Sequence, residues 1–293
     1  MSDKTEQGID ALKQQLSFLP GVLSRTILER ILQTINYEPV IGIMGKTGAG
    51  KSSLCNALFH GDVSPISDVT ACTREPLRFR LRSGNHSLIL MDLPGVGESE
   101  QRDREYEALY HRTLPELDLV LWVIKADDRA LSVDEQFYCR VIDGYRHRVL
   151  FVVNQADKIE PCHKWNTTSN IPSPHQSINI EAKLNAIRQL FSPYHPVCAV
   201  SVRTGWNLPS MVETMMCCLP DLATSPLAMQ LQGKLCNESV KKQAREGFGS
   251  AVGSVFDTAE SSSFIPAPVQ VVIRKVREAV VSVASSIWDW IFF

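Results

Sequence analysis

The amino-acid sequence predicts an α/β fold of three layers, with helices on both faces of a mixed, mostly parallel sheet. From Val40 onward, short apolar runs alternate with helical patterns, an order typical of strand–helix–strand units. Most of these runs are apolar without interruption, as expected for strands that are buried on both faces. A glycine-rich segment at 45–52 follows the first run directly and has the GxxxxGK[ST] pattern of a phosphate-binding loop (P-loop).

The order of the elements predicts three regions. Residues 1–37 have the pattern of a helical hairpin that breaks at Pro20 and Gly21. The expected strands are Val40–Met44, Ser87–Asp92, Leu117–Ile124, Val149–Asn154 and Val197–Ser201. The expected helices are Lys51–Leu58, Ser99–Thr113, Val133–Ile142, Ile180–Phe191 and Leu208–Cys217. We therefore expect an α/β domain over 38–220 and a helical C-terminal region over 221–293.

One strand has a different pattern. In Leu77–Arg82, apolar and basic residues alternate strictly, which is typical of a strand with one face in water. Arg78, Arg80 and Arg82 therefore share a face. We interpret the segment as an antiparallel edge strand that is protected by its charges, and the alternative is a site for an acidic partner.

The composition excludes several classes of protein. With 293 residues, 44% of them hydrophobic and 21% charged, the chain is neither collagen-like nor wholly disordered. A formal net charge of −2 gives no overall positive field to hold nucleic acid. No run of about 20 uncharged apolar residues offers a transmembrane helix. The eight cysteines show no paired CxxC spacing, so we expect a reduced, cytoplasmic protein.

The C-terminal segment predicts an amphipathic helix. From Val269 to Ile291, apolar residues recur at helical spacing, and aromatic residues gather at the end of the chain. The segment is too short and too charged to span a bilayer. Its apolar stripe could pack against the N-terminal hairpin, form a dimer, or lie on a membrane surface. We favour packing within the chain or in a dimer.

The glycine-rich loop carries the chemistry of phosphate binding. Glycines allow the backbone to curl so that successive N–H groups point at phosphate oxygens, and the following helix adds its N-terminal dipole. Lys51 would neutralise charge on the β- and γ-phosphates, and the Ser52 hydroxyl would bind Mg²⁺.

Two further motifs follow the ends of expected strands. In Asp92-Leu93-Pro94-Gly95, the carboxylate can hold Mg²⁺, usually through water, and the glycine N–H can approach the γ-phosphate. In Asn154-Gln155-Ala156-Asp157, the carboxylate of Asp157 can accept hydrogen bonds from N1–H and the exocyclic amine of guanine. Adenine lacks this pair of donors, so the motif predicts a preference for guanine.

These segments, together with Ser201-Val202-Arg203, resemble the G1, G3, G4 and G5 boxes of translation-factor-class GTPases over about residues 38–218. Residues 66–75 resemble the switch I segment of the Era-like branch, and that register implies that Thr73 binds Mg²⁺ and senses the γ-phosphate. The residues of the G1 and G3 boxes resemble those of small bacterial GTP-binding proteins of the YfjP and YeeP type. The resemblance implies a P-loop GTPase that hydrolyses GTP to GDP and phosphate with Mg²⁺ and acts as a switch.

The sequence departs from the family pattern at three positions. Gln155 replaces a lysine that normally lies along the base and braces the phosphate loop, so we expect weaker nucleotide binding. Val96 stands where some GTPases place a water-orienting glutamine, so we expect slow hydrolysis or a partner that assists it. Gly48 replaces the asparagine of potassium-dependent relatives, which argues against that route.

The expected site combines these assignments. Catalysis is assigned to Lys51, Thr73 and Gly95, and Mg²⁺ binding to Ser52, Thr73 and Asp92. Nucleotide binding is assigned to Gly45, Lys46, Thr47, Gly48, Ala49, Gly50, Lys51, Ser52, Ser53, Asp92, Leu93, Pro94, Gly95, Asn154, Gln155, Asp157, Ser201, Val202 and Arg203.

The expected partners follow from the same interpretation. GTP and GDP are the expected ligands, and the family resemblance implies an effector protein or the ribosome. A second copy of the chain and the inner membrane surface are further expected partners. The alternative functions are a GTP-binding interaction module that does not hydrolyse GTP, and a membrane-docked GTPase that uses the C-terminal helix.

Overall fold

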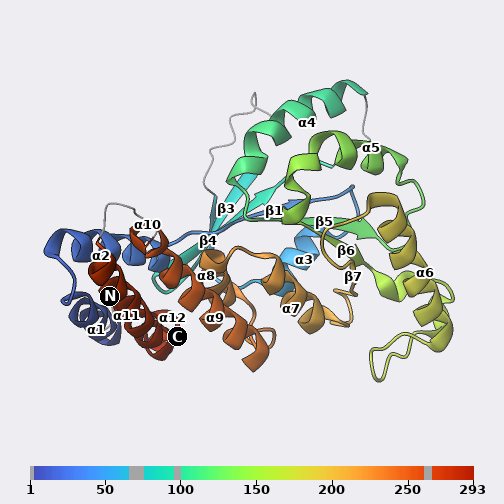
Figure 1. Ribbon diagram of the computed structural model, residues 1–293. Coiled ribbons are helices and arrows are strands. Elements are labelled where there is room, and N and C mark those ends of the chain that lie inside the picture. The colour runs from blue at the N-terminus through green and yellow to red at the C-terminus, as the bar shows by residue number, and fades with distance from the viewer. Residues whose placement is uncertain (1–2, 66–75, 96–99, 261–265) are drawn as a thin grey trace.

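The computed structural model describes residues 3–65, 76–95, 100–260 and 266–293, and within these residues seven strands form one sheet (Figure 1). The strands are β1 (Val40–Met44), β2 (Asp62–Pro65), β3 (Leu77–Ser83), β4 (His86–Asp92), β5 (Leu119–Lys125), β6 (Val149–Asn154) and β7 (Cys198–Ala199). Their order is β2-β3-β4-β1-β5-β6-β7. Strand β3 is antiparallel to β2 and β4, and the remaining pairs are parallel. The predicted fold class is therefore confirmed.

The prediction that Leu77–Arg82 forms the edge of the sheet is wrong. Strand β3 is antiparallel as expected, but β2 lies outside it and takes the edge position. The polar, proline-containing Asp62–Pro65 has no apolar run by which a strand could be recognised. Two of the three arginines of β3 also have partners within the chain, since Arg78 pairs with Glu116 at 2.9 Å and Arg80 with Glu38 at 2.6 Å.

Helices cover both faces of the sheet (Figure 1). They are α1 (Asp3–Leu16), α2 (Gly21–Ile35), α3 (Lys51–Leu58), α4 (Glu100–Thr113), α5 (Ser132–Val141), α6 (Pro174–Phe191), α7 (Leu208–Cys218), α8 (Asp221–Gln230), α9 (Glu238–Ser254), α10 (Asp257–Glu260), α11 (Ala267–Ser286) and α12 (Trp288–Phe292). Helices α4, α5 and α6 share a core with one face, and α3 and α7 share a core with the other. The carboxyl ends of the parallel strands stay free of these layers, which places the loops that follow them together at one edge.

The core beneath α4, α5 and α6 is dominated by aromatic side chains. Phe151 of β6 lies with its ring centroid 4.7 Å from that of Phe191 and 5.2 Å from that of Trp122, and all three side chains are buried. Aromatic side chains bury large apolar areas. This core fixes β5 and β6, and thereby the ends of both strands at the candidate site.

The helices of both termini pack together at the end of the sheet near the β3–β4 turn (Figure 1). They share one hydrophobic cluster with α3. The stripe expected on the C-terminal helix is packed within the chain, and its buried residues on α11 are Ile273, Val276, Val280 and Ala284. Helix α12 is fixed by a hydrogen bond of 2.8 Å from Trp288 Nε1 to Ser225 Oγ. Among the described helices, none combines the length and the apolar character needed to cross a membrane.

Candidate nucleotide site

The loop between β1 and α3 has a backbone that requires glycine. Gly45 has a φ of +142°, and a Cβ atom there would lie 2.1 Å from the backbone oxygen of Val123. Gly50 has a φ of +90°, and its Cβ would lie 2.4 Å from Asn154 Nδ2. Side chains at either position would therefore clash with the neighbouring strand ends. The glycines let the loop approach β5 and β6 closely before α3 begins at Lys51.

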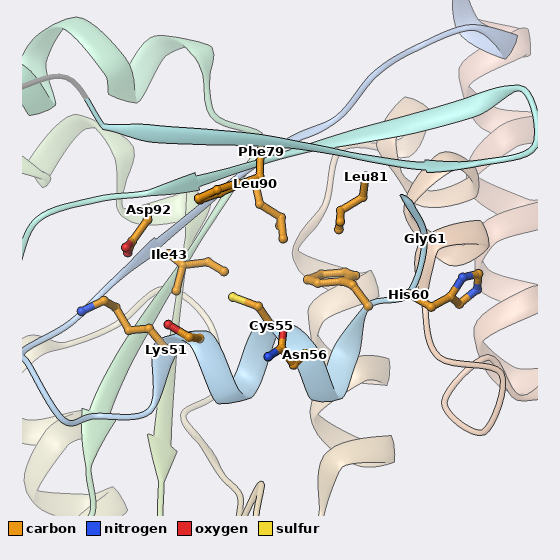
Figure 2. A pocket seen from close by; sticks show the side chains of 12 residues that line it. Ile43, Lys51, Cys55, Asn56, His60, Gly61, Phe79, Leu81, Leu90 and Asp92 are labelled. Atoms are coloured by element: carbon orange, nitrogen blue, oxygen red, sulfur yellow. The ribbon is translucent and has the colours of Figure 1, made fainter. Parts of the chain in front are cut away.

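Lys51 lies over this loop. Its Nζ donates a hydrogen bond of 2.7 Å to the backbone oxygen of Gly45, so the ammonium group stays at the mouth of the loop. Figure 2 shows the Lys51 and Asp92 side chains at the same end of a cavity. A fixed positive charge beside the N-terminus of a helix is suited to hold phosphate oxygens.

Asp92 ends β4 and pairs with Ile43 of β1. Its Oδ1 is buried and has no hydrogen-bond partner among the described residues. Burial raises the pKa of Asp92, and the positive charge of Lys51 opposes this rise. A buried carboxylate oxygen without a donor fits a cation or its bound water, and Ser52 lines the same cavity with a hydroxyl. The carboxylate oxygen of Asp92 and the hydroxyl of Ser52 therefore fit Mg²⁺, which prefers oxygen ligands.

The segment after β4 approaches the phosphate loop. Leu93 N donates to Ile43 O at 2.8 Å, and a Cβ at Gly95 would lie 2.7 Å from Gly45 O. The buried hydroxyl of Tyr110, on α4, donates to the backbone oxygen of Pro94 at 2.8 Å. Tyr110 was not among the predicted site residues, because the sequence shows only two tyrosines, Tyr106 and Tyr110, in a strongly polar helix.

Asn154 joins three loops at the end of β6. Its buried Nδ2 donates to Ala49 O at 3.0 Å, in the phosphate loop. Its Oδ1 accepts from Gln155 N at 2.7 Å and from Val202 N at 3.3 Å. A side-chain amide has N–H donors and an oxygen acceptor, so it can hydrogen-bond to the backbone of all three loops at once. Asn154 therefore fixes the walls of the site.

Gln155 reaches the phosphate loop. It has a left-handed backbone, with a φ of +64°, and its Nε2 donates to Gly48 O at 2.8 Å. Its Oε1 accepts a hydrogen bond of 2.8 Å from Lys158 Nζ. Since glutamine is shorter than the family lysine and uncharged, the sequence predicts weaker nucleotide binding or weaker guanine discrimination. The structure places the contact that braces the phosphate loop on the neutral amide.

Asp157 lies at the opposite end of the site from Lys51, in a short 3₁₀ turn. Its side chain is 1% exposed. Ser201 Oγ donates to Oδ1 at 2.5 Å, Arg203 Nε donates to Oδ2 at 2.9 Å, and Arg203 Nη2 forms an ion pair with Oδ2 at 2.7 Å. An open cavity of about 330 Å³ adjoins these groups. It is lined by Gly50, Ser53, Asn154, Gln155, Asp157, Lys158, Val202 and Arg203.

Other predicted residues have different positions. The Lys46 ammonium pairs with Asp134 at 2.7 Å and Asp128 at 3.1 Å, so its side chain is bound to the β5–α5 region. Thr47 is exposed at the surface of the loop. Thr73 and Val96, assigned to the switch and to the attacking water, lie outside the described residues.

An apolar cavity of about 270 Å³ continues from the Lys51–Asp92 end of the site (Figure 2). It lies between α3 and strands β1, β3 and β4. Its apolar lining is formed by Ile43, Cys55, Phe59, Phe79, Leu81 and Leu90. Burial raises the pKa of the Cys55 thiol to about 12, so this cysteine stays protonated and unreactive at neutral pH.

Residues 40–155 match the family model described as "50S ribosome-binding GTPase". The uncharacterized protein YkfA of Escherichia coli K12 is 56% identical over 287 residues, which cover 98% of this chain and 99% of YkfA. The uncharacterized protein YfjP of the same organism is 54% identical over 290 residues, covering 99% and 100%.

More distant similarity is found to GTPase Era of Aquifex aeolicus, which is 26% identical over 185 residues, or 62% of this chain and 56% of Era. Among solved structures, Aquifex aeolicus Era bound to GDP·AlF4− has a TM-score of 0.45 and 24% identity, with coverage of 65% of this chain and 66% of that one.

Proposed function

The chain belongs to the family of YkfA and YfjP and contains an Era-like P-loop GTPase domain, and we propose that it binds GTP and hydrolyses it to GDP and phosphate with Mg²⁺. In this proposal the phosphates lie against the loop at 45–52 and the guanine lies in the cavity beside Asp157. The nucleotide acts as a switch.

One observation carries this proposal: the loop after β6 is hydrogen-bonded to the phosphate loop after β1, which makes one unit of the two. Asn154 holds Ala49 O, and Gln155 holds Gly48 O, so the base end is tied directly to the phosphate loop. The cation of Lys51 and the carboxylate of Asp157 lie at the two ends of this unit. A guanine nucleotide has the complementary charges, with anionic phosphates at one end and an N–H edge at the other.

The proposed mechanism uses positioning and charge. Lys51 neutralises charge on the β- and γ-phosphates, and the N–H of Gly95 approaches the γ-phosphate. Ser52 and Asp92, with Thr73 from the family resemblance, hold Mg²⁺, which neutralises charge on the phosphate oxygens when bound. Water attacks the γ-phosphorus in line, so no protein nucleophile is required.

Hydrolysis by the isolated chain is proposed to be slow. Val96 has no hydrogen-bonding side-chain atom to orient the attacking water, so the missing group must come from elsewhere in the chain or from a partner. This residue also supports the second candidate function, a GTP-binding interaction module that does not hydrolyse GTP. Release of phosphate in a single turnover separates the two.

We propose a GTPase domain over 38–220, with residues 1–37 and 221–293 as one helical unit beside it. The partner of this unit is proposed to be an effector protein or, by analogy with the 50S ribosome-binding GTPase family, the ribosome. Pull-down from lysate with the protein loaded with GDP or a GTP analogue tests this. The partner should be enriched in one loading state only.

Calorimetric titration of nucleotide-stripped full-length protein tests the proposed ligand. GTP and GDP should bind with 1:1 stoichiometry, ATP should bind at least a hundredfold more weakly, and chelation of Mg²⁺ should weaken GTP binding. Equal affinity for ATP and GTP would contradict the guanine assignment. Absence of binding by all three nucleotides would contradict the proposed function.

A further inference from the structure

The carboxylate of Asp157 is bound by a second group in addition to Ser201. Arg203 Nε donates a hydrogen bond to Oδ2 at 2.9 Å, and Arg203 Nη2 lies 2.7 Å from the same oxygen in an ion pair. The Asp157 side chain is 1% exposed, whereas that of Arg203 is 71% exposed. A buried carboxylate is therefore paired with a guanidinium group that lies largely in solvent.

The guanidinium group resembles the edge of guanine that Asp157 is proposed to recognise. Both present two N–H donors on nitrogens that share one carbon atom. An ionised carboxylate has about four lone-pair positions, two on each oxygen. Oδ1 accepts a hydrogen bond from Ser201 Oγ, and both Nε and Nη2 of Arg203 lie against Oδ2. N1–H and the 2-amino group of guanine together need one position on each oxygen, and Oδ2 is the oxygen that the guanidinium group covers.

Ser201 and Arg203 differ in how easily each can move away from the Asp157 carboxylate. Ser201 is fully buried, its N–H donates to Trp206 O at 3.1 Å, and its Oγ accepts from Thr204 N at 3.3 Å. Arg203 lies at the rim of the open cavity and is mostly exposed. Of the two, Arg203 can therefore turn away without breaking the surrounding structure.

We propose that Arg203 competes with the 2-amino group of guanine for Oδ2 of Asp157, and so limits how strongly this protein distinguishes guanine from bases that lack that group. The inference rests on the proposed function. The guanidinium group must move from its place against Oδ2 before a guanine nucleotide makes its second contact. Hypoxanthine has N1–H but no 2-amino group, so an inosine nucleotide needs only a position on Oδ1.

The experiment measures dissociation constants of GDP and IDP for nucleotide-stripped full-length protein. In Arg203→Ala, GDP should bind about fivefold more tightly, the size expected when an ion pair with one exposed partner no longer competes. IDP affinity should stay within twofold, so the GDP/IDP preference should rise about fivefold. Arg203→Lys, which retains the charge but not the two-donor fork, should fall between.

Lys158→Ala is the matched control for charge. Lys158 lines the same cavity but donates to Gln155 and not to Asp157. Its removal should change GDP and IDP affinity by the same factor. A second measurement uses thermal unfolding: Arg203→Ala should lower the melting temperature of the stripped protein more than that of the GDP-saturated protein.

Different results would overturn different statements. If GDP and IDP affinities change in parallel in Arg203→Ala, or if GDP alone binds more weakly, the competition proposal is wrong. If neither nucleotide binds to the wild type or to any variant, the proposed function is wrong and the competition falls with it.

Discussion

Gln155 Nε2 donates a hydrogen bond to the backbone oxygen of Gly48, across 2.8 Å between the end of β6 and the phosphate loop. The donor is a neutral amide at a position where the family pattern has lysine. The contact is possible because the left-handed backbone at Gln155 directs the side chain toward the loop. Bracing the loop therefore requires a donor of sufficient reach, and a positive charge is not essential for it.

We predict that Gln155→Ala weakens GDP binding by about two- to tenfold, the range for loss of one neutral hydrogen bond of about 0.5–1.5 kcal/mol. Gln155→Lys should bind GDP at least as tightly as the wild type, because lysine restores the family contact. Calorimetric titration measures both. Unchanged affinity in Gln155→Ala would mean that Asn154 alone holds the loop.

Much of this site was predictable because its residues follow apolar strands directly. Asp92 ends β4, Asp157 follows the end of β6, and Lys51 begins the helix after the loop that follows β1. The parallel direction of β1, β4 and β6 brings these segments to one edge of the sheet. Residue spacing and the 3.3 Å rise of a strand determine this arrangement, so side-chain detail was not required.

The features that were not predicted depend on tertiary structure. Strand β2 was missed because Asp62–Pro65 has no apolar pattern, and it forms only because β3 offers an unpaired edge. The contact of Tyr110 with Pro94 depends on how α4 packs on the sheet. The pairing of Arg203 with Asp157 depends on the path of the loop after β7. No periodic pattern of residues in the sequence marks any of these three features.

We predict that Lys51→Ala abolishes tight binding of GTP and GDP, because phosphate charge in the loop would lose its cation. Lys46→Ala is the matched control in the same loop, since the Lys46 ammonium is bound by Asp134 and Asp128. It should retain GDP binding within tenfold. Calorimetric titration of both variants with GTP and GDP tests the prediction. Tight GTP binding by Lys51→Ala would exclude the phosphate-loop assignment.

We predict that Asp92→Asn stabilises the protein in the absence of Mg²⁺ and nucleotide. Burial raises the pKa of Asp92, so the folded protein holds this proton more tightly than the unfolded chain does. The wild type therefore loses stability as pH rises from the ordinary aspartate pKa through the raised folded value, and the asparagine variant does not.

Melting temperatures in EDTA at pH 4 and pH 7 check the prediction for Asp92. The advantage of the variant should be larger at pH 7. With Mg²⁺ and GTP the order should reverse, because the carboxylate then has its cation. A variant that is less stable at both pH values in EDTA would show that Asp92 has a structural partner.

We predict that Tyr110→Phe lowers the free energy of unfolding by about 0.5–1.5 kcal/mol, since the backbone oxygen of Pro94 loses its hydrogen-bond donor. The ring and its packing against Phe137, at 4.9 Å between centroids, are retained. Denaturant titration measures the loss. GDP affinity should change less than in Gln155→Ala, because Tyr110 contacts the segment after Asp92 and not the base cavity.

We predict that Trp288→Ala lowers the free energy of unfolding by about 3–5 kcal/mol, the cost of removing a buried aromatic side chain. Trp288 also donates to Ser225, and the next turn of α12 brings Ile291 O to 3.2 Å from His86 Nε2. Trp290→Ala is the matched control, because that side chain is 44% exposed, and it should cost less than 1 kcal/mol.

The Trp288→Ala variant should unfold in a single transition at lower denaturant concentration. Helices α12 and α3 share one hydrophobic cluster, and Phe59 after α3 pairs with Leu231 after α8. Two separate transitions, with GDP protecting only one of them, would show that the terminal helices fold independently of the nucleotide site.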